Sequence, residues 1–184
     1  MIKIVSIYIL ITLLYAIIRY NIFGGVPFHD IPTYILNKSI SFTMILLLAT
    51  IIYKQIKGYK DEVLELIRSF KILTFIHILL SLSLLSKTYY SRLFTDEGLN
   101  LFGNLTILFG ILALTYMYFV KTKFNYLLFL VFIALHLVFL GVKVWFNVDK
   151  WLGYMPPISL ICFLTVAFLA ILVKYNSLHD DFNS

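Results

Sequence analysis

The chain has 184 residues, of which 61% are hydrophobic and 13% are charged, and its mean hydropathy is +0.95. Soluble domains are roughly 45 to 50% apolar, so this composition excludes a soluble domain and predicts an integral membrane protein. The formal net charge of +6 accompanies long apolar blocks, and we interpret it as topological bias and attraction to a lipid bilayer, with no nucleic-acid partner.

The apolar residues form blocks close to the roughly 20 residues of a spanning helix, unlike the short alternating segments of an outer-membrane barrel. We predict six transmembrane helices, over residues 4–18, 34–53, 67–86, 99–120, 124–146 and 157–174. The first resembles a secretory signal but lacks a small-residue cleavage site, so we expect an uncleaved anchor. The predicted fold is an all-α integral membrane protein, a six-helix bundle that forms a single transmembrane domain over residues 1–184.

The orientation is predicted from the basic residues, which favour the cytoplasmic side. With the N-terminus inside, nine basic residues lie on the inner side and six on the outer side: Arg19, Lys38, Lys87, Arg92, Lys143 and Lys150. We therefore expect both termini to be cytoplasmic, in a bacterial inner membrane. An aromatic belt is expected at the outer interface, formed by Trp145, Trp151, Tyr89 and Tyr90.

Two histidines, His77 and His136, each lie inside a long apolar run with no other ionisable group nearby. A polar ring in hydrocarbon is costly, so an intramembrane histidine is by default a candidate functional residue. Two imidazoles that face each other at one depth in a helix bundle suit a b-type haem, whose low-spin iron takes one nitrogen ligand on each face. A proton or ion path, and structural packing with each ring bonded to a neighbouring helix, remain as alternatives.

The depths of the two histidines test this pairing. His136 follows Phe124 by 12 residues, or about 18 Å along a helix. His77 lies about 15 Å deep if residues 61–71, which have a helical pattern and an acidic start, extend the third helix and if Arg68 and Lys71 snorkel to the inner interface. The two depths then agree within one turn.

Neighbouring residues also suit a flat cofactor. Lys143 follows His136 by seven residues, on nearly the same helical face, and with Lys87 or Arg92 it could neutralise haem propionates. Gly103 and Gly110 leave a small surface on the fourth predicted helix. The alternatives are that Lys143 snorkels to the outer interface and that the glycines mark close helix contacts.

Several chemistries are excluded or weakly indicated. Cys162 is the only cysteine, which excludes an intrachain disulfide, a redox Cys pair and covalent c-type haem attachment. The sequence has no P-loop, dinucleotide fingerprint or serine elbow. His29 beside Asp30 is a weak metal signal in a loop. The absence of a selectivity-loop signature argues against a channel.

Four segments in order carry a resemblance to a known family. They are the glycine- and proline-bearing loop 24–32, the basic connection 67–71, Phe75-Ile76-His77, and Ala134-Leu135-His136 followed by Val142-Lys143. This order resembles the ferric reductase-like transmembrane family, and in particular the small haem-binding subunits of the periplasmic methionine sulfoxide reductase system. The chain departs from the pattern at Asn37-Lys38, where a Gly-Arg pair is usual. It also has no further histidine on the fifth predicted helix, so one haem b is expected.

The resemblance implies a b-type haem-binding membrane electron-transfer protein that relays electrons across or out of the inner membrane to a partner oxidoreductase. It implies His77 and His136 as the metal ligands, with Lys143 and Arg92 at the propionates. The electrons would come from quinone chemistry or from a flavin in a partner, and the acceptor would be a separate soluble oxidoreductase chain. The alternative is a non-catalytic polytopic membrane subunit or assembly factor with structural intramembrane histidines.

Overall fold

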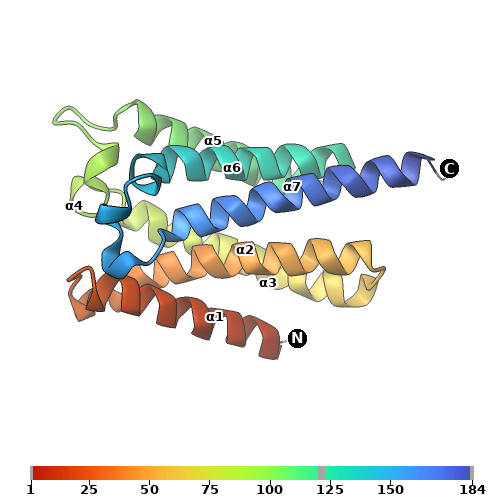
Figure 1. The fold of residues 1–184 in the computed structure, drawn as a ribbon, viewed down its shortest axis with the longest axis horizontal. Coiled ribbons are helices and arrows are strands. Elements are labelled where there is room, and N and C mark those ends of the chain that lie inside the picture. The colour runs from red at the N-terminus through yellow and green to blue at the C-terminus, as the bar shows by residue number, and fades with distance from the viewer. Residues whose placement is uncertain (1, 120–122, 183–184) are drawn as a thin grey trace.

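A computed structural model of the chain describes residues 2–119 and 123–182, and within these ranges it is helical apart from short connections (Figure 1). Six long helices are present in the described residues: α1 (Ile2–Ala16), α2 (Leu36–Ile56), α3 (Lys60–Ser83), α5 (Leu101–Phe119), α6 (Lys123–Trp145) and α7 (Ile158–Phe182). The connections carry a short helix α4 (Lys87–Tyr90) and six brief helical turns: η1 (Ile17–Ile22), η2 (Phe28–Asp30), η3 (Ile31–Ile35), η4 (Ser91–Leu93), η5 (Val148–Lys150) and η6 (Leu152–Tyr154).

The all-helical fold class is confirmed, and the six helices follow the predicted order. Five of them are long and apolar enough to cross a membrane, and the number rises to six if α3 and the α4–η4 segment, bent by 101°, count as one broken span. The expected end of the fourth helix at Val120 lies outside the described residues. Several helices extend beyond their predicted bounds, since η1 lengthens the first to Ile22 and α7 continues to Phe182.

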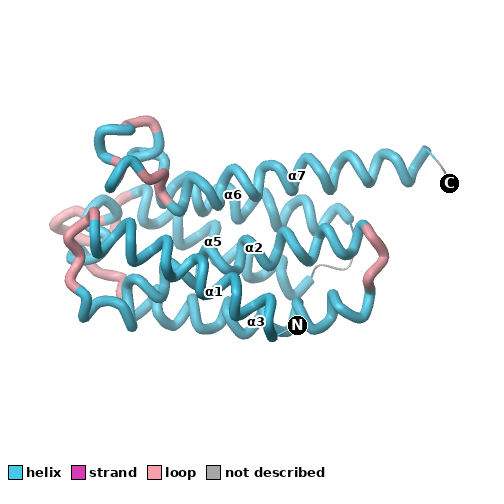
Figure 2. The backbone as a smooth tube through the Cα atoms, turned by 60° about the horizontal axis from the view of Figure 1, so that its bottom comes forward, coloured by secondary structure: helices cyan, strands magenta, loops and turns pink. Residues whose placement is uncertain are grey.

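The helices lie side by side in a bundle, with the longer connections gathered at one end (Figures 1 and 2). This loop end contains residues 23–30, 84–100 and 146–157. The start of α1 and the end of α7 point toward the opposite end, here called the terminal end. The helices α1, α3 and α7 pack closely against α2, while α6 packs against α5 and α7. The helices are therefore packed in the order α3–α2–α7–α6–α5. The two ends of this order lie near each other, so that α3 is also close to α5 and α6.

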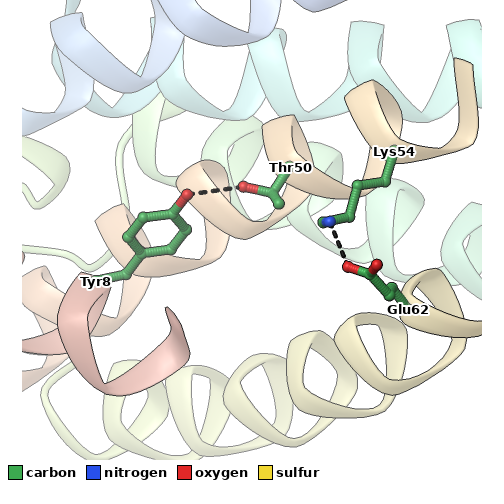
Figure 3. Close-up of polar contacts among 4 residues, drawn as sticks. All are labelled: Tyr8, Thr50, Lys54 and Glu62. Atoms are coloured by element: carbon green, nitrogen blue, oxygen red, sulfur yellow. Dashed lines mark hydrogen bonds and ion pairs between the residues drawn. The ribbon is translucent and has the colours of Figure 1, made fainter. Parts of the chain in front are cut away.

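The turn between α2 and α3 explains why the third helix starts earlier than its apolar run. Gly58 has φ +80°, a left-handed conformation that suits glycine and ends α2, and α3 begins two residues later. Glu62 in the first turn of α3 pairs with Lys54 of α2 (Figure 3). The helical pattern predicted for residues 61–71 is thus confirmed as the beginning of α3.

Hydroxyl groups join α1 to α2. Tyr8 and Thr50 share a hydrogen bond of 2.9 Å between their hydroxyl oxygens (Figure 3). Deeper in the contact, Thr12 is fully buried and its hydroxyl lies 2.9 Å from that of Ser39 and 2.7 Å from that of Thr43. Polar contacts of this kind hold helices together where apolar packing distinguishes poorly between neighbour and lipid.

Three residues predicted for the outer interface are in fact buried. Arg19 is only 3% exposed, because its guanidinium Nη1 donates hydrogen bonds to the carbonyl oxygens of Leu152 and Met155. Trp145 packs in the core, where its indole N–H donates to Ser159 Oγ at 3.0 Å. Tyr90, also expected in the aromatic belt, is 8% exposed. Contrary to the expected belt, Trp145 and Tyr90 are therefore turned into the bundle, where the Trp145 N–H has an acceptor and the Tyr90 hydroxyl oxygen accepts from the Lys38 ammonium and the Asn37 amide.

Candidate functional site

His77 lies on the inward stripe of α3, which also carries the buried Phe70, Leu73 and Thr74. Its Nδ1 lies 2.7 Å from the side-chain oxygen of Asn37, a residue of α2 that is 1% exposed. The Asn37 amide nitrogen donates to Ser81 Oγ at 3.1 Å, so the Asn37 oxygen is the atom that faces the ring. Because this oxygen only accepts, Nδ1 of His77 carries the hydrogen and Nε2 keeps its lone pair.

His136 lies on α6 and is held in a similar way by α5. Its Nδ1 is 2.8 Å from the backbone carbonyl oxygen of Thr106, which can only accept a hydrogen bond. The ring rests over Gly110, where an added Cβ would come within 3.1 Å of Nδ1. Neutral His136 is thus also the Nδ1–H tautomer, with Nε2 free to donate a lone pair.

The imidazole rings of His77 and His136 lie at the seam between α3 and the α5–α6 pair. Neither α5 nor α6 is among the close packing partners of α3, although α3 returns toward both. On the terminal side the seam is bridged by side chains, with the ring centroids of Phe70 and Phe129 6.5 Å apart. On the loop side it is closed by a small apolar cluster of Leu84, Tyr90 and Leu93. The imidazoles of His77 and His136 lie between these two contacts.

Both histidines lie in the half of the bundle nearer the loop end. His77 is six residues from the end of α3 and His136 nine residues from the end of α6, or about 9 Å and about 14 Å. The difference is within one helical turn. Both histidine residues are partly buried.

Lys38, the residue after Asn37, is a cation that the sequence pattern placed at the outer interface. In the fold its ammonium group is half-buried, donates a hydrogen bond to the Tyr90 hydroxyl at 3.4 Å, and lies 4.6 Å and 5.1 Å from the ring centroids of Tyr90 and Tyr34. The Tyr90 hydroxyl also lies 3.5 Å from the Asn37 amide nitrogen, which links Lys38 to the residue that contacts His77. Sequence reasoning missed Asn37, Lys38 and Tyr90 as parts of one site.

The two predicted propionate partners lie farther out. Lys143 is exposed, and its Nζ lies 4.2 Å from the centroid of the Phe102 ring. Arg92 is exposed in η4. Gly103, expected to leave room for a macrocycle, instead accommodates the chain before α5, since an added Cβ would lie 2.5 Å from the Leu93 carbonyl oxygen.

A hollow lies at the loop end, outside the seam. It has a volume of about 330 Å³, and Asp30, Tyr34 and Tyr89 contribute to its lining. The Tyr89 hydroxyl donates to Asp30 at 3.1 Å, and the Tyr34 and Tyr89 rings stack at 5.5 Å. His29, next to Asp30, is exposed. Among the described residues, no group of three or more His, Cys, Asp or Glu side chains could hold a metal ion.

Each of the two imidazoles directs its Nδ1–H to an oxygen on a neighbouring helix, which leaves the lone pair of Nε2 on both rings. Histidines that bind metals almost always donate their second ring N–H to a carbonyl or carboxylate, which fixes the ring and raises its basicity. Asn37 and the Thr106 carbonyl provide this support to His77 and His136. A scan against protein-family models and a search of curated proteins find nothing that matches this chain.

Proposed function

We propose that this chain is a b-type haem-binding membrane electron-transfer protein, in which His77 and His136 are the axial ligands. The observation that supports this most is the shared state of the two imidazoles, each of which donates Nδ1–H to an oxygen acceptor and leaves Nε2 available. The rings come from α3 and α6, two helices that contact each other through the Phe70 and Phe129 rings. This donor set fits low-spin haem iron.

The chain's own residues would orient and insulate the site. Asn37 and the Thr106 carbonyl hold the two rings against rotation, so that little order is lost on binding. Phe70, Phe129 and the cluster of Leu84, Tyr90 and Leu93 exclude water from either end of the seam. A bound haem would supply one-electron chemistry. The donor would be quinol or a flavin reductase, and the acceptor a separate soluble oxidoreductase.

The expected setting is a bacterial inner membrane crossed six times, with both termini cytoplasmic. The apolar helices and the shared direction of the two chain ends support this topology. Single cysteines placed at Lys3 and at Lys87, in a Cys162→Ala background, should react with a membrane-impermeant maleimide from opposite sides of the membrane. Labelling of both positions from one side would contradict the topology.

The haem proposal is tested by the visible spectrum. Protein purified in mild detergent from haem-replete cells should show a sharp b-type α-band in a reduced-minus-oxidised difference spectrum. His77→Ala and His136→Ala should each lose this band. His29→Ala is the matched control, because His29 is exposed at the loop end, and it should keep the band. A colourless wild-type protein, or a band that survives both alanine substitutions, refutes the assignment.

One observation favours a second function, that of a non-catalytic membrane subunit. Each imidazole already has a hydrogen-bond partner in the chain, which is also what a purely structural histidine needs. In that case His77→Ala and His136→Ala would insert normally and lose stability without losing any cofactor. Stoichiometric co-purification with another membrane complex would then be expected.

A further inference from the structure

Lys38 is a cation inside the bundle whose counter-ion is not supplied by the described part of the chain. The two ion pairs found there are Lys54–Glu62 and Lys87–Asp96, and neither involves Lys38. Its ammonium group has three N–H donors, of which one is directed to the Tyr90 hydroxyl. A buried or half-buried charge is normally paired, so the missing negative charge points to a ligand.

The surroundings of Lys38 hold the ammonium in place without neutralising it. The Tyr34 and Tyr90 rings lie within 5.1 Å of Nζ, and their faces attract a cation but carry no charge. Tyr90 is fixed in turn, because its hydroxyl also lies 3.5 Å from the Asn37 amide nitrogen. Asn37 is the residue that orients His77, so the cation and the imidazole share one hydrogen-bonded support.

Lys38 is also better placed toward the imidazoles than the two basic residues that the sequence suggested. It is half-buried, and it is linked to His77 through the Tyr90 hydroxyl and the Asn37 side chain. Lys143 and Arg92 are exposed, where water screens a charge and an ion pair contributes little.

We propose that Lys38 binds a carboxylate of the ligand that His77 and His136 hold, which for haem is a propionate. This inference rests on the proposed function. The ammonium and the carboxylate would form a charge-assisted hydrogen bond in a partly desolvated site, where such bonds are strong. Lys38 thereby sets which porphyrin side chain enters the loop half of the seam.

The test compares haem with haem dimethyl ester, whose propionates are uncharged while its iron is unchanged. Each porphyrin is titrated into the purified apoprotein, and binding is followed by the low-spin spectrum. The wild type should bind haem about tenfold or more tightly than the ester, as expected for one hydrogen bond to a charged group. Lys38→Met should bind both porphyrins with the affinity that the wild type shows for the ester. Lys38→Arg should keep the preference for haem.

Lys150→Met is the matched control, because Lys150 is an exposed lysine at the same end of the bundle, and it should keep the preference. Unchanged binding of the ester by Lys38→Met shows that the site is folded. Equal binding of both porphyrins by the wild type, or a preference that survives in Lys38→Met, overturns the inference. So does a preference lost only in Lys143→Met. A wild type that gives no low-spin spectrum with either porphyrin refutes instead the proposed function.

Discussion

Replacement of Asn37 by alanine tests whether the support of His77 serves a ligand or only the fold. Asn37 is 1% exposed and contacts His77 at 2.7 Å, Ser81 at 3.1 Å and Tyr90 at 3.5 Å. Hydrogen bonds between membrane helices contribute about 0.6 kcal/mol each on average, so the loss of three predicts about 2 kcal/mol of destabilisation. If the site binds haem, loss of this support should also weaken haem affinity by about 10- to 100-fold.

The assay measures haem affinity by spectroscopic titration and stability by unfolding of the apoprotein in detergent. Ser39→Ala is the matched control: Ser39 lies on the same helix, is fully buried, and bonds to Thr12 of α1 at 2.9 Å. It should lose stability and keep its haem affinity. The reasoning is refuted if Asn37→Ala and Ser39→Ala weaken haem binding equally, because the effect would then follow stability alone.

Three further substitutions probe other parts of the fold. Gly110→Ala would bring a methyl group within 3.1 Å of the His136 ring, so the α-band should weaken or shift in the difference spectrum. Thr12→Val removes two hydroxyl contacts between α1 and α2, and we expect about 1 kcal/mol of destabilisation in an unfolding titration. Arg19→Met removes the donor to the Met155 carbonyl, so amide hydrogen exchange should accelerate in residues 147–156; unchanged exchange there would contradict this anchoring role.

The helices could be predicted from the sequence because hydropathy depends only on local composition. The order of the six helices is confirmed, and so is the early start of α3, which the acidic turn at Asp61 and Glu62 indicated. The end of the first helical segment, which η1 carries on to Ile22, was placed too early because Arg19 was interpreted as an interface residue. Its carbonyl partners are more than a hundred residues away in sequence, and no local pattern announces such a contact.

The candidate site was predicted only in part. His77 and His136 stand out in sequence because each is a lone polar ring in an apolar run. The Thr106 carbonyl is a backbone group and leaves no sequence signal. Asn37 and Lys38 lie within the first turns of the second helix, where polar residues usually face the membrane interface. An asparagine inside a predicted span was nevertheless an available signal, because its amide needs an intramembrane partner.

The distribution of the site over the chain has a consequence for its biogenesis. The Asn37–His77 bond is made entirely within the first three long helices, and the Thr106–His136 bond entirely within α5 and α6. Close packing between these two halves runs through α2 and α7, and α7 follows both halves in the chain. Each half can therefore orient its own imidazole during synthesis, while the two halves pack together only after α7 has been made. A nascent chain without α7 would carry two half-sites, and under the proposed function haem insertion would follow the synthesis of α7.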